Sequence, residues 1–416
     1  MKELHIDIAV IGGGPAGLAA ALEAKRLGAG QVVILERDME LGGILQQCIH
    51  DGFGIHRFNE RLSGAQYAQR FIDRLEGSGI EVKLDTIVLE LTEDKVIYAC
   101  NPKEGMLRLQ CKAVILAMGC RERTASQVLI YGSRPAGVMT AGTAQRYINM
   151  EGYLPGKKAV ILGSGDIGLI MARRMTLEGI QVEGVYEVMP APGGLTRNIV
   201  QCLDDYGIPL HLSDTVVKIK GNKRVESVTV CKVDENRRPV PGTEREIPCD
   251  LLVLAVGLIP ENELSREAGI QIDAKTKGPV VDNCFMTSCP GIFACGNVAV
   301  VFDLVDYVSQ SGEIAAGGAV KYLRGELPEH PIYREVKAGE GINFVVPQKL
   351  RADCSGEEVT FFMRVKAPGK KVLLQCAVGQ EIVKKERHNS VAPPEMLASK
   401  VHVAENAIPE FRIVEG

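Results

Sequence analysis

The 416-residue sequence predicts an α/β protein in which one strand–turn–helix unit occurs twice and a smaller β-rich region follows. Residues 6–11 form a β-branched run, apolar except for Asp7, that is typical of buried parallel strands, followed by the glycine-rich turn 12–17 and an alanine-rich helical stretch. Residues 157–162 repeat the strand pattern, and the glycine turn 163–168 comes directly after them. Residues 331–416 contain strand-like runs and no turn of this kind.

The two glycine turns have the pattern and spacing of Rossmann-like dinucleotide sites. Both match G-x-G-x-x-G, and an acid follows the first glycine by 24 residues in each copy. The first glycine permits a sharp turn, the second lets a pyrophosphate approach the helix N-terminus, and the third lets helix and strand pack closely. The acid can accept hydrogen bonds from a ribose hydroxyl. The residues in these roles are Gly12, Gly14, Gly17 and Glu36 in the first copy and Gly163, Gly165, Gly168 and Glu187 in the second.

Composition and charge argue against several classes of protein. The formal net charge is −4 and the sequence pI is near 6.1, whereas a nucleic-acid surface needs a clustered excess of Lys and Arg. The longest apolar run, residues 251–259, is far shorter than the roughly 20 residues that span a bilayer. The N-terminus does not have the pattern of a secretion signal. We therefore expect a cytoplasmic protein without a nucleic-acid partner or a membrane span.

Twelve cysteines are scattered through the chain, mostly in apolar strands. They include no C-x-x-C pair and no short Cys/His cluster with the spacing of a zinc or iron–sulfur site. The sequence therefore predicts no metal site. It favours small, buried cysteines in a reducing compartment.

Further motifs, in order along the chain, resemble those of a known family. After the first turn and Glu36 come L-G-G at 41–43, A-M-G at 117–119 behind an apolar strand, and G-I-F-A-C-G-N at 291–297. Over residues 5–325 this order resembles the flavoproteins with two dinucleotide-binding domains, which include the pyridine-nucleotide disulfide reductases. The resemblance implies FAD on the first unit and NAD(P)H on the second unit, which is inserted within the first.

The resemblance also implies domain limits and site residues. The FAD-binding domain is expected at 1–125 and 256–330, the NAD(H)-binding domain at 126–255, and a small β-rich domain at 331–416. The residues expected at FAD are Gly12, Gly14, Pro15, Ala16, Gly17, Glu36, Arg37, Gly43, Ile44, Val88, Ala117, Gly119, Gly296 and Asn297. Those expected at the nicotinamide nucleotide are Gly163, Gly165, Asp166, Ile167, Gly168 and Glu187. Asn297 stands where the family has an acid on the ribityl chain, so it can bind a hydroxyl without carrying a charge.

Glu187 bears on which nicotinamide nucleotide binds. A carboxylate at this position accepts a hydrogen bond from a free ribose 2′-hydroxyl and repels a 2′-phosphate, and NADP-binding sites usually carry arginine there. The sequence therefore favours NAD(H). Hydride would pass between the nicotinamide and the flavin, and the protein would supply position and electrostatics.

Cys48 is the candidate redox thiol. Disulfide reductases carry two cysteines after the G-G pair, but only Cys48 follows it here, and Ile170 stands at the position of a family glutamate. A dithiol relay is therefore not expected. With His50, Asp51 and His56 nearby, Cys48 could serve a stand-alone NADH oxidase or peroxidase. The alternative is a structural cysteine in a loop that passes under the flavin.

A closer resemblance is to one subgroup. The segments 42–54, 118–124, 134–145 and 303–309 are similar to NAD(P)/FAD-dependent subunits of multi-subunit dehydrogenases. Such subunits occur in sarcosine oxidase, in opine and proline dehydrogenases, in hydrogen cyanide synthase and beside a glycerol-3-phosphate dehydrogenase. The resemblance implies that partner subunits handle a small amino or hydroxy compound. Several relatives bind an iron–sulfur cluster in a cysteine-rich C-terminal segment, whereas only two cysteines lie there in this chain, so a cluster would belong to a partner.

The role of residues 331–416 stays open between two interpretations. The region could dock partner subunits, or it could cover an apolar face of the FAD-binding domain. A hypothesis from another class is a non-catalytic, flavin-bound assembly or sensor module. Rapid bleaching of the flavin by NADH would argue against that hypothesis.

Overall fold

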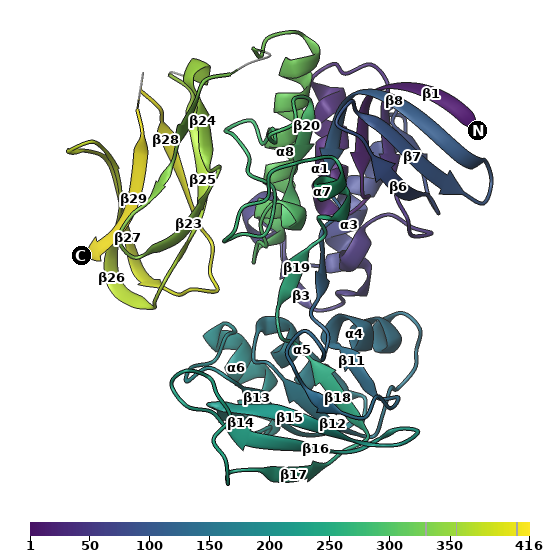
Figure 1. Ribbon diagram of the computed structural model, residues 1–416, viewed down its shortest axis with the longest axis vertical. Helices are drawn as coiled ribbons and strands as arrows, with labels where there is room; N and C mark the ends of the chain where they lie inside the picture. Colours follow the sequence, from purple (N-terminus) through teal and green to yellow (C-terminus); the bar gives the residue numbers. More distant parts are fainter. Residues whose placement is uncertain (329–330, 355, 405–406) are drawn as a thin grey trace. The chain divides into compact units, whose positions relative to one another are not determined.

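The computed structural model describes residues 1–328, 331–354, 356–404 and 407–416. The chain forms two compact units, one of Met1–Cys120 with Pro260–Gly416 and one of Arg121–Ile259 (Figure 1). The second unit is therefore an insertion in the first, and it extends a few residues beyond the expected 126–255 at each end. Strands β9 (Cys120–Glu122) and β19 (Leu258–Pro260) pair where the chain passes between the units. The predicted α/β fold with a β-rich C-terminal region is confirmed.

A seven-stranded sheet forms the core of the first unit. Its strands are β1 (Lys2–Ile11), β2 (Val32–Leu35), β5 (Glu81–Lys83), β6 (Ile87–Leu91), β7 (Val96–Asn101), β8 (Gly105–Leu116) and β20 (Ile292–Ala294). β1 is parallel to β2 on one side and to β8 on the other, and β8 continues into an antiparallel meander with β7 and β6. Ile8, Val33 and Ile115 are fully buried, as the continuous apolar runs predict for strands covered on both faces.

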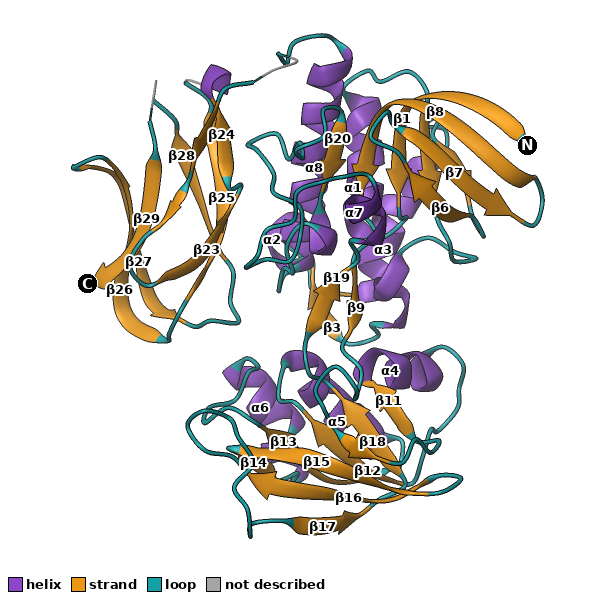
Figure 2. Ribbon diagram, viewed as in Figure 1, coloured by secondary structure: helices purple, strands orange, loops and turns teal. Residues whose placement is uncertain are grey.

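Two long helices of the first unit pack together on this sheet (Figure 2). They are α1 (Pro15–Arg26) and α8 (Val305–Leu323), and they approach closely at Gly312, where a Cβ would overlap the Ala16 carbonyl oxygen. The shorter elements are α2 (Ile55–Phe58), α3 (Gly64–Ile72), α7 (Glu263–Glu267), η1 (Gly43–Gln47), η2 (Asp73–Leu75), η4 (Gly296–Val298), β3 (Asp51–Phe53) and β4 (Leu62–Ser63). Gly312 and Ala16 are small residues because the two helix backbones nearly touch.

The second unit has a parallel sheet with the order β11-β18-β12-β13-β14 and a second sheet with the order β10-β15-β16-β17. The parallel strands are β11 (Val138–Thr140), β12 (Lys158–Leu162), β13 (Gln181–Glu187), β14 (Leu210–Leu212) and β18 (Leu251–Leu254). The other elements are β10 (Tyr131–Gly132), β15 (Asp214–Gly221), β16 (Val225–Lys232), β17 (Arg245–Pro248), α4 (Ala141–Asn149), α5 (Asp166–Leu177), α6 (Thr196–Cys202) and η3 (Asp204–Tyr206). Val160 and Leu252 share a core with Val228 of the second sheet, so β strands cover one face of the parallel sheet.

The described residues between 331 and 416 form a β-sandwich that belongs to the first unit. Its elements are β21 (Tyr333–Glu335), β22 (Lys337–Ala338), β23 (Ile342–Val346), β24 (Lys349–Arg351), η5 (Ala352–Cys354), β25 (Glu358–Val365), β26 (Gly369–Val378), β27 (Glu381–Val391), β28 (Leu397–His402) and β29 (Pro409–Glu415). One sheet has the order β22-β29-β26-β27 and the other β23-β25-β28. Phe361 and Phe411, one from each sheet, are fully buried with ring centroids 4.9 Å apart, so the sandwich has its own core.

Aromatic contacts join the sandwich to the rest of the first unit. Phe362 of β25 is fully buried, and its side chain faces away from the sandwich core. Its ring centroid lies 5.1 Å from that of Phe302 and 5.5 Å from that of Tyr307. Phe285 packs edge-on against the same ring at 6.4 Å. The sandwich therefore covers apolar side chains of the nucleotide-binding part.

Polar contacts follow the same junction. The backbone N–H groups of Gln348 and Lys349 donate to the Val281 carbonyl oxygen. Arg351 and Asp282 form an ion pair of 3.6 Å in which both side chains are 1% exposed, and burial raises the pKa of the Asp282 carboxyl to about 6. These buried contacts support the interpretation that residues 331–416 cover an apolar face.

Candidate dinucleotide sites

The first glycine turn joins β1 to α1, and its glycines serve different purposes. Gly12 has φ +108°, and a Cβ there would lie 2.5 Å from the Ala117 carbonyl oxygen. A Cβ on Gly17 would overlap the Gly12 carbonyl oxygen, so the fold itself requires both glycines. Gly14 has φ −76°, and a Cβ there would meet nothing within 4 Å. Since Gly14 is the N-cap of α1 without a side-chain cap, this open space fits a pyrophosphate on the helix N-terminus.

Glu36 ends β2 beside this turn. Its side chain is 6% exposed, and one carboxylate oxygen accepts from the Gly13 backbone N–H at 2.6 Å. The other oxygen accepts from the Asp38 backbone N–H at 2.8 Å. Two bonds leave lone pairs on the carboxylate for further donors, such as ribose hydroxyls. Arg37, the next residue, is exposed.

The second turn, between β12 and α5, repeats the first in detail. Gly163 has φ +103°, and Cβ atoms on Gly163 and Gly168 would overlap backbone oxygens. Gly165 is the N-cap of α5, it has no side-chain cap, and a Cβ there would again meet nothing within 4 Å. Both turns therefore offer the same open, N–H-lined space at a helix N-terminus.

Glu187 at the end of β13 matches Glu36. It is 7% exposed, and one carboxylate oxygen accepts from the Ser164 backbone N–H at 2.9 Å and from the Ser164 hydroxyl at 2.6 Å. The other oxygen accepts from the Met189 backbone N–H at 2.9 Å. The hydroxyl of Ser164, where the first copy has Gly13, is a contact that the motif did not predict.

The turn Asp166–Ile167–Gly168 opens α5. Asp166 lies in the first helical turn, and its carboxylate accepts from the Leu195 backbone N–H at 2.9 Å and the Asn198 side chain at 2.7 Å. Ile167 packs against the core of the second unit. Asp166 therefore binds the N-cap residue and the first turn of α6.

Other residues expected at FAD come from distant segments that meet near the first turn. A Cβ on Gly43 would lie 3.2 Å from Gly14 Cα, and a Cβ on Gly296 would lie 2.7 Å from Ala16 Cβ. The structure thus brings these four residues into one region. Pro15 lies between Gly14 and Ala16 in the chain, and the Ala117 carbonyl lies next to Gly12. Ile44 is 59% exposed next to Gly43.

Asn297 and Gly119 come from two separate chain segments of the first unit. The Asn297 side-chain oxygen accepts from the Phe302 backbone N–H at 3.0 Å, and its amide lies 3.6 Å from the Cys120 sulfur. Gly119, just before Cys120, has φ +71° and open space at its Cβ position. The amide is therefore held at a fixed orientation without a charge.

Val88 lies in β6, at the edge of the sheet and away from β1 in the strand order. Two residues earlier, the Thr86 backbone N–H donates to the Glu36 carbonyl oxygen at 2.8 Å, and Asp85 N–H donates to Asp38. This segment therefore borders the acid of the first site and not its glycine turn. Thr86 and Asp85 lacked any sequence motif that would have singled them out.

Cys48 follows η1 and is buried. Its thiol donates to the Ile44 carbonyl oxygen at 3.3 Å, and a Cβ on Gly64 would lie 2.5 Å from Cys48 Cβ, so α3 packs directly on it. None of the twelve cysteines forms a disulfide. The ring of His50 packs 5.0 Å from that of Phe53.

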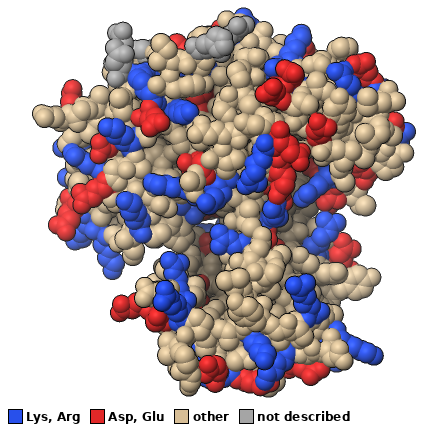
Figure 3. All heavy atoms as spheres, in the orientation of Figure 1, with Lys and Arg blue, Asp and Glu red and all other residues tan. Residues whose placement is uncertain are grey.

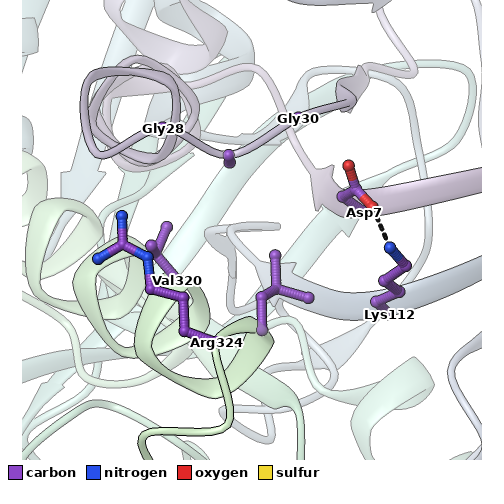
Figure 4. A pocket seen from close by; sticks show the side chains of 8 residues that line it. Asp7, Gly28, Gly30, Lys112, Val320 and Arg324 are labelled. Atoms are coloured by element: carbon purple, nitrogen blue, oxygen red, sulfur yellow. Dashed lines mark ion pairs between the residues drawn. The ribbon is translucent and has the colours of Figure 1, made fainter.

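A small cavity of about 190 Å³ lies at the opposite end of α1 from the glycine turn (Figure 4). Lys112 and Asp7 form an ion pair of 2.8 Å there, and Arg324 donates to the Leu27 carbonyl oxygen, which caps the end of α1. The residues that line this cavity belong to neither glycine turn, so we do not assign it to the dinucleotides.

Acidic and basic side chains are interspersed over the face of the molecule in Figure 3. Across the described ranges, no three or more His, Cys, Asp and Glu side chains are grouped so that they could hold a metal ion. No helix in the described part of the chain has the length and apolar character needed to cross a membrane.

The fold matches solved structures of low sequence identity. It superposes on thioredoxin reductase from T. acidophilum with a TM-score of 0.62 and 24% identity, covering 76% of this chain and 98% of that one. It superposes on L-proline dehydrogenase from P. horikoshii with a TM-score of 0.56 and 22% identity, covering 78% and 56%. These likenesses show a shared architecture.

Curated relatives are components of larger enzymes by name. Hydrogen cyanide synthase subunit HcnB of Pseudomonas aeruginosa is 27% identical over 71% of this chain and 67% of its own length. An opine oxidase subunit of Agrobacterium tumefaciens is 26% identical over 76% and 66%. The small chain of glutamate synthase [NADPH] from Escherichia coli is 27% identical over 78% and 70%. The chain therefore spans about two thirds of the length of these relatives.

Residues 6–312 match the model of the family described as pyridine nucleotide-disulphide oxidoreductase. This match covers well over half of the chain and includes both glycine turns, which the structure shows to be open at their helix N-termini. The family and its structural neighbours use FAD and NAD(P)H. The chain belongs to the pyridine nucleotide-disulphide oxidoreductase family and is an oxidoreductase that uses FAD and NAD(P)H.

Proposed function

We propose that the chain passes hydride between NAD(H), bound on the second unit, and FAD, bound on the first. The observation that carries this proposal is the pair of uncapped helix N-termini at Gly14 and Gly165, each with open space and a buried carboxylate beside its turn. Bound FAD would supply a group able to accept a hydride from the nicotinamide and to pass electrons to a further acceptor.

The residues of this chain bind and orient. The N–H groups that begin α1 and α5 hold the two pyrophosphates, and Glu36 and Glu187 bind the adenosine riboses. Because hydrogen bonds from the turn hold both carboxylates, each is pre-oriented before a nucleotide arrives. Asn297 offers its amide to the ribityl hydroxyls. The chain thus supplies position and electrostatics, and no side chain is needed as a nucleophile.

We also propose NAD(H) as the preferred nicotinamide nucleotide. Glu187 accepts three hydrogen bonds from Ser164 and Met189, and its negative charge beside the ribose position disfavours a 2′-phosphate. The glutamate synthase relative is named for NADPH, so the choice of cofactor would differ among relatives of this chain.

The relatives' names support a role as the flavoprotein subunit of a multi-subunit dehydrogenase. Hydrogen cyanide synthase, opine oxidase, sarcosine oxidase and glutamate synthase each provide a subunit or chain that is similar to this one. We propose that partner subunits bind a small amino or hydroxy compound and that one of them carries an iron–sulfur cluster. Residues 331–416 hold only two cysteines, too few for a cluster of their own.

The test of this function uses the purified full chain. It should be yellow, release FAD on denaturation, and lose its flavin absorbance when NADH is added without oxygen. Release of FMN would contradict the role of Glu36, because FMN has no adenosine ribose. If the flavin stays oxidised when NADH is added, the result would favour the hypothesis of a non-catalytic, flavin-bound sensor module.

Replacing Cys48 with serine should leave the rate of NADH-to-dye electron transfer nearly unchanged. Its thiol is buried under α3 and bonded to a carbonyl oxygen, so it is not presented as a nucleophile. The rate is measured with an artificial acceptor, with flavin content and thermal unfolding as controls. A loss of about a hundredfold with FAD still bound would equal about 2.7 kcal/mol of barrier and would favour the NADH oxidase or peroxidase alternative.

A further inference from the structure

The internal repeat extends beyond the acid. In the first copy, a glycine pair at 42–43 stands 30 and 31 residues after Gly12. In the second copy, a glycine pair at 193–194 stands 30 and 31 residues after Gly163. The second pair lies in the loop between β13 and α6, beyond the part of the unit that the G-x-G-x-x-G motif describes.

In the first copy the glycine pair lies against the turn. The Gly42 backbone N–H donates to the Gly13 carbonyl oxygen at 2.9 Å. The missing Cβ of Gly43 would lie 3.2 Å from Gly14 Cα, so this loop forms a second wall beside the open space at the start of α1.

In the second copy the contacts recur with a different acceptor. The Gly193 backbone N–H donates to the Ser164 hydroxyl at 2.8 Å, so a side chain replaces the backbone carbonyl of the first copy. A Cβ on Gly193 would lie 3.6 Å from the Gly165 nitrogen. The loop is therefore a second wall beside the start of α5.

Gly193 is a glycine that the fold does not require. Its φ is not positive, and a Cβ would meet its nearest atoms, in Gly165 and Ser164, at 3.6 to 3.8 Å, which is ordinary contact distance. Gly194 differs, because a Cβ there would lie 2.6 Å from the Leu169 side chain. Gly165 is likewise not required by the fold. Two neighbouring glycines that the fold does not require point to a molecule that lies against both.

Residues of the turn itself hold the loop in place. Ser164 is fully buried, donates its hydroxyl to Glu187 and accepts from Gly193. Asp166 accepts from the Leu195 backbone N–H and from Asn198. These donors also offset the negative charge of Asp166, which would otherwise oppose an anion at the start of α5.

We infer that Gly193 is a binding residue of the NAD(H) site and that Ser164 and Asp166 are positioning residues that hold it there. Gly165 and the loop with Gly193 would lie on opposite sides of the pyrophosphate, and because Gly193 has no Cβ its backbone could approach the phosphates closely. The ligand is the pyrophosphate of a dinucleotide, and the inference rests on the proposed assignment of NAD(H) to the second unit.

The test is calorimetric titration of the FAD-loaded full chain with NAD⁺, ADP-ribose and AMP. Gly193→Ala should raise the Kd for NAD⁺ and for ADP-ribose by about tenfold or more, since the added methyl occupies the pyrophosphate space. The Kd for AMP, which lacks the second phosphate, should change much less. Flavin content and the thermal unfolding midpoint should stay at parent values, because the fold accepts a Cβ at this position.

Gly317→Ala is the matched control, because a Cβ at this α8 position of the first unit also meets nothing within 4 Å. It should leave all three Kd values unchanged. Ser164→Gly, which copies Gly13 of the first turn, should weaken NAD⁺ binding and speed amide hydrogen exchange across 188–195.

Three results would overturn the inference, and they differ. If the parent chain binds NAD⁺ and Gly193→Ala binds it equally well, only the role of Gly193 fails. If the parent binds neither NAD⁺ nor ADP-ribose while retaining FAD, the proposed function of the second unit fails, and the inference fails with it. An equal loss of affinity for AMP would also contradict contact with the pyrophosphate.

Discussion

Phe362→Ala should lower the free energy of unfolding of the first unit by about 3–5 kcal/mol, the cost of removing a large buried aromatic side chain. The ring is fully buried and touches Phe302, Tyr307 and Phe285, so its loss leaves a cavity between the sandwich and the nucleotide-binding part. Chemical denaturation followed through the flavin signal would measure the change. Flavin release should coincide with unfolding, since Phe302 and Tyr307 follow Asn297 closely in the chain.

The control for this variant is Val383→Ala in β27. Val383 is 44% exposed in the same domain, so its loss should change stability by no more than about 0.5 kcal/mol. A Phe362→Ala protein as stable as the control would contradict the packing role.

Removal of residues 331–416 should have a stronger effect of the same kind. It would expose these buried rings to water and remove Arg351, the ion-pair partner of Asp282. We expect an insoluble or flavin-free product. A soluble, yellow, truncated chain that no longer captures partner subunits would instead favour the docking interpretation.

Glu187→Gln should narrow the preference for NADH over NADPH by about 1–3 kcal/mol, which corresponds to roughly five- to 150-fold in the ratio of kcat/KM values. Glutamine keeps the size of the side chain and removes the charge that repels the 2′-phosphate. Because one carboxylate oxygen also holds Ser164, part of the change should be a loss of NADH affinity. Stopped-flow reduction of the flavin by both nucleotides measures the ratio.

Glu183→Gln is the matched control, since Glu183 lies on the same strand and pairs with Lys158. It should leave the ratio unchanged. Equal rates with NADH and NADPH in the parent protein would defeat the argument from Glu187.

The two nucleotide units could be predicted from the sequence because their parts are contiguous. A strand, a glycine turn and a helix follow one another directly, and parallel β1 and β2 place Glu36 beside Gly13 by strand pairing alone. The same reasoning holds for Glu187 and Ser164. Local rules of chain direction and spacing are enough for these contacts.

Tertiary structure alone decided the rest. Phe362 and Phe285 lie far apart in the chain, as do Arg351 and Asp282, and no local pattern states that they meet. The alternating pattern in residues 331–416 predicts strands but does not state what their faces contact. The sequence could therefore not distinguish a surface that docks partner subunits from one that covers the FAD-binding domain. The glycine pair at 193–194 repeats the spacing of the pair at 42–43, but only folding places Gly193 against Gly165, because contact between two loops depends on packing.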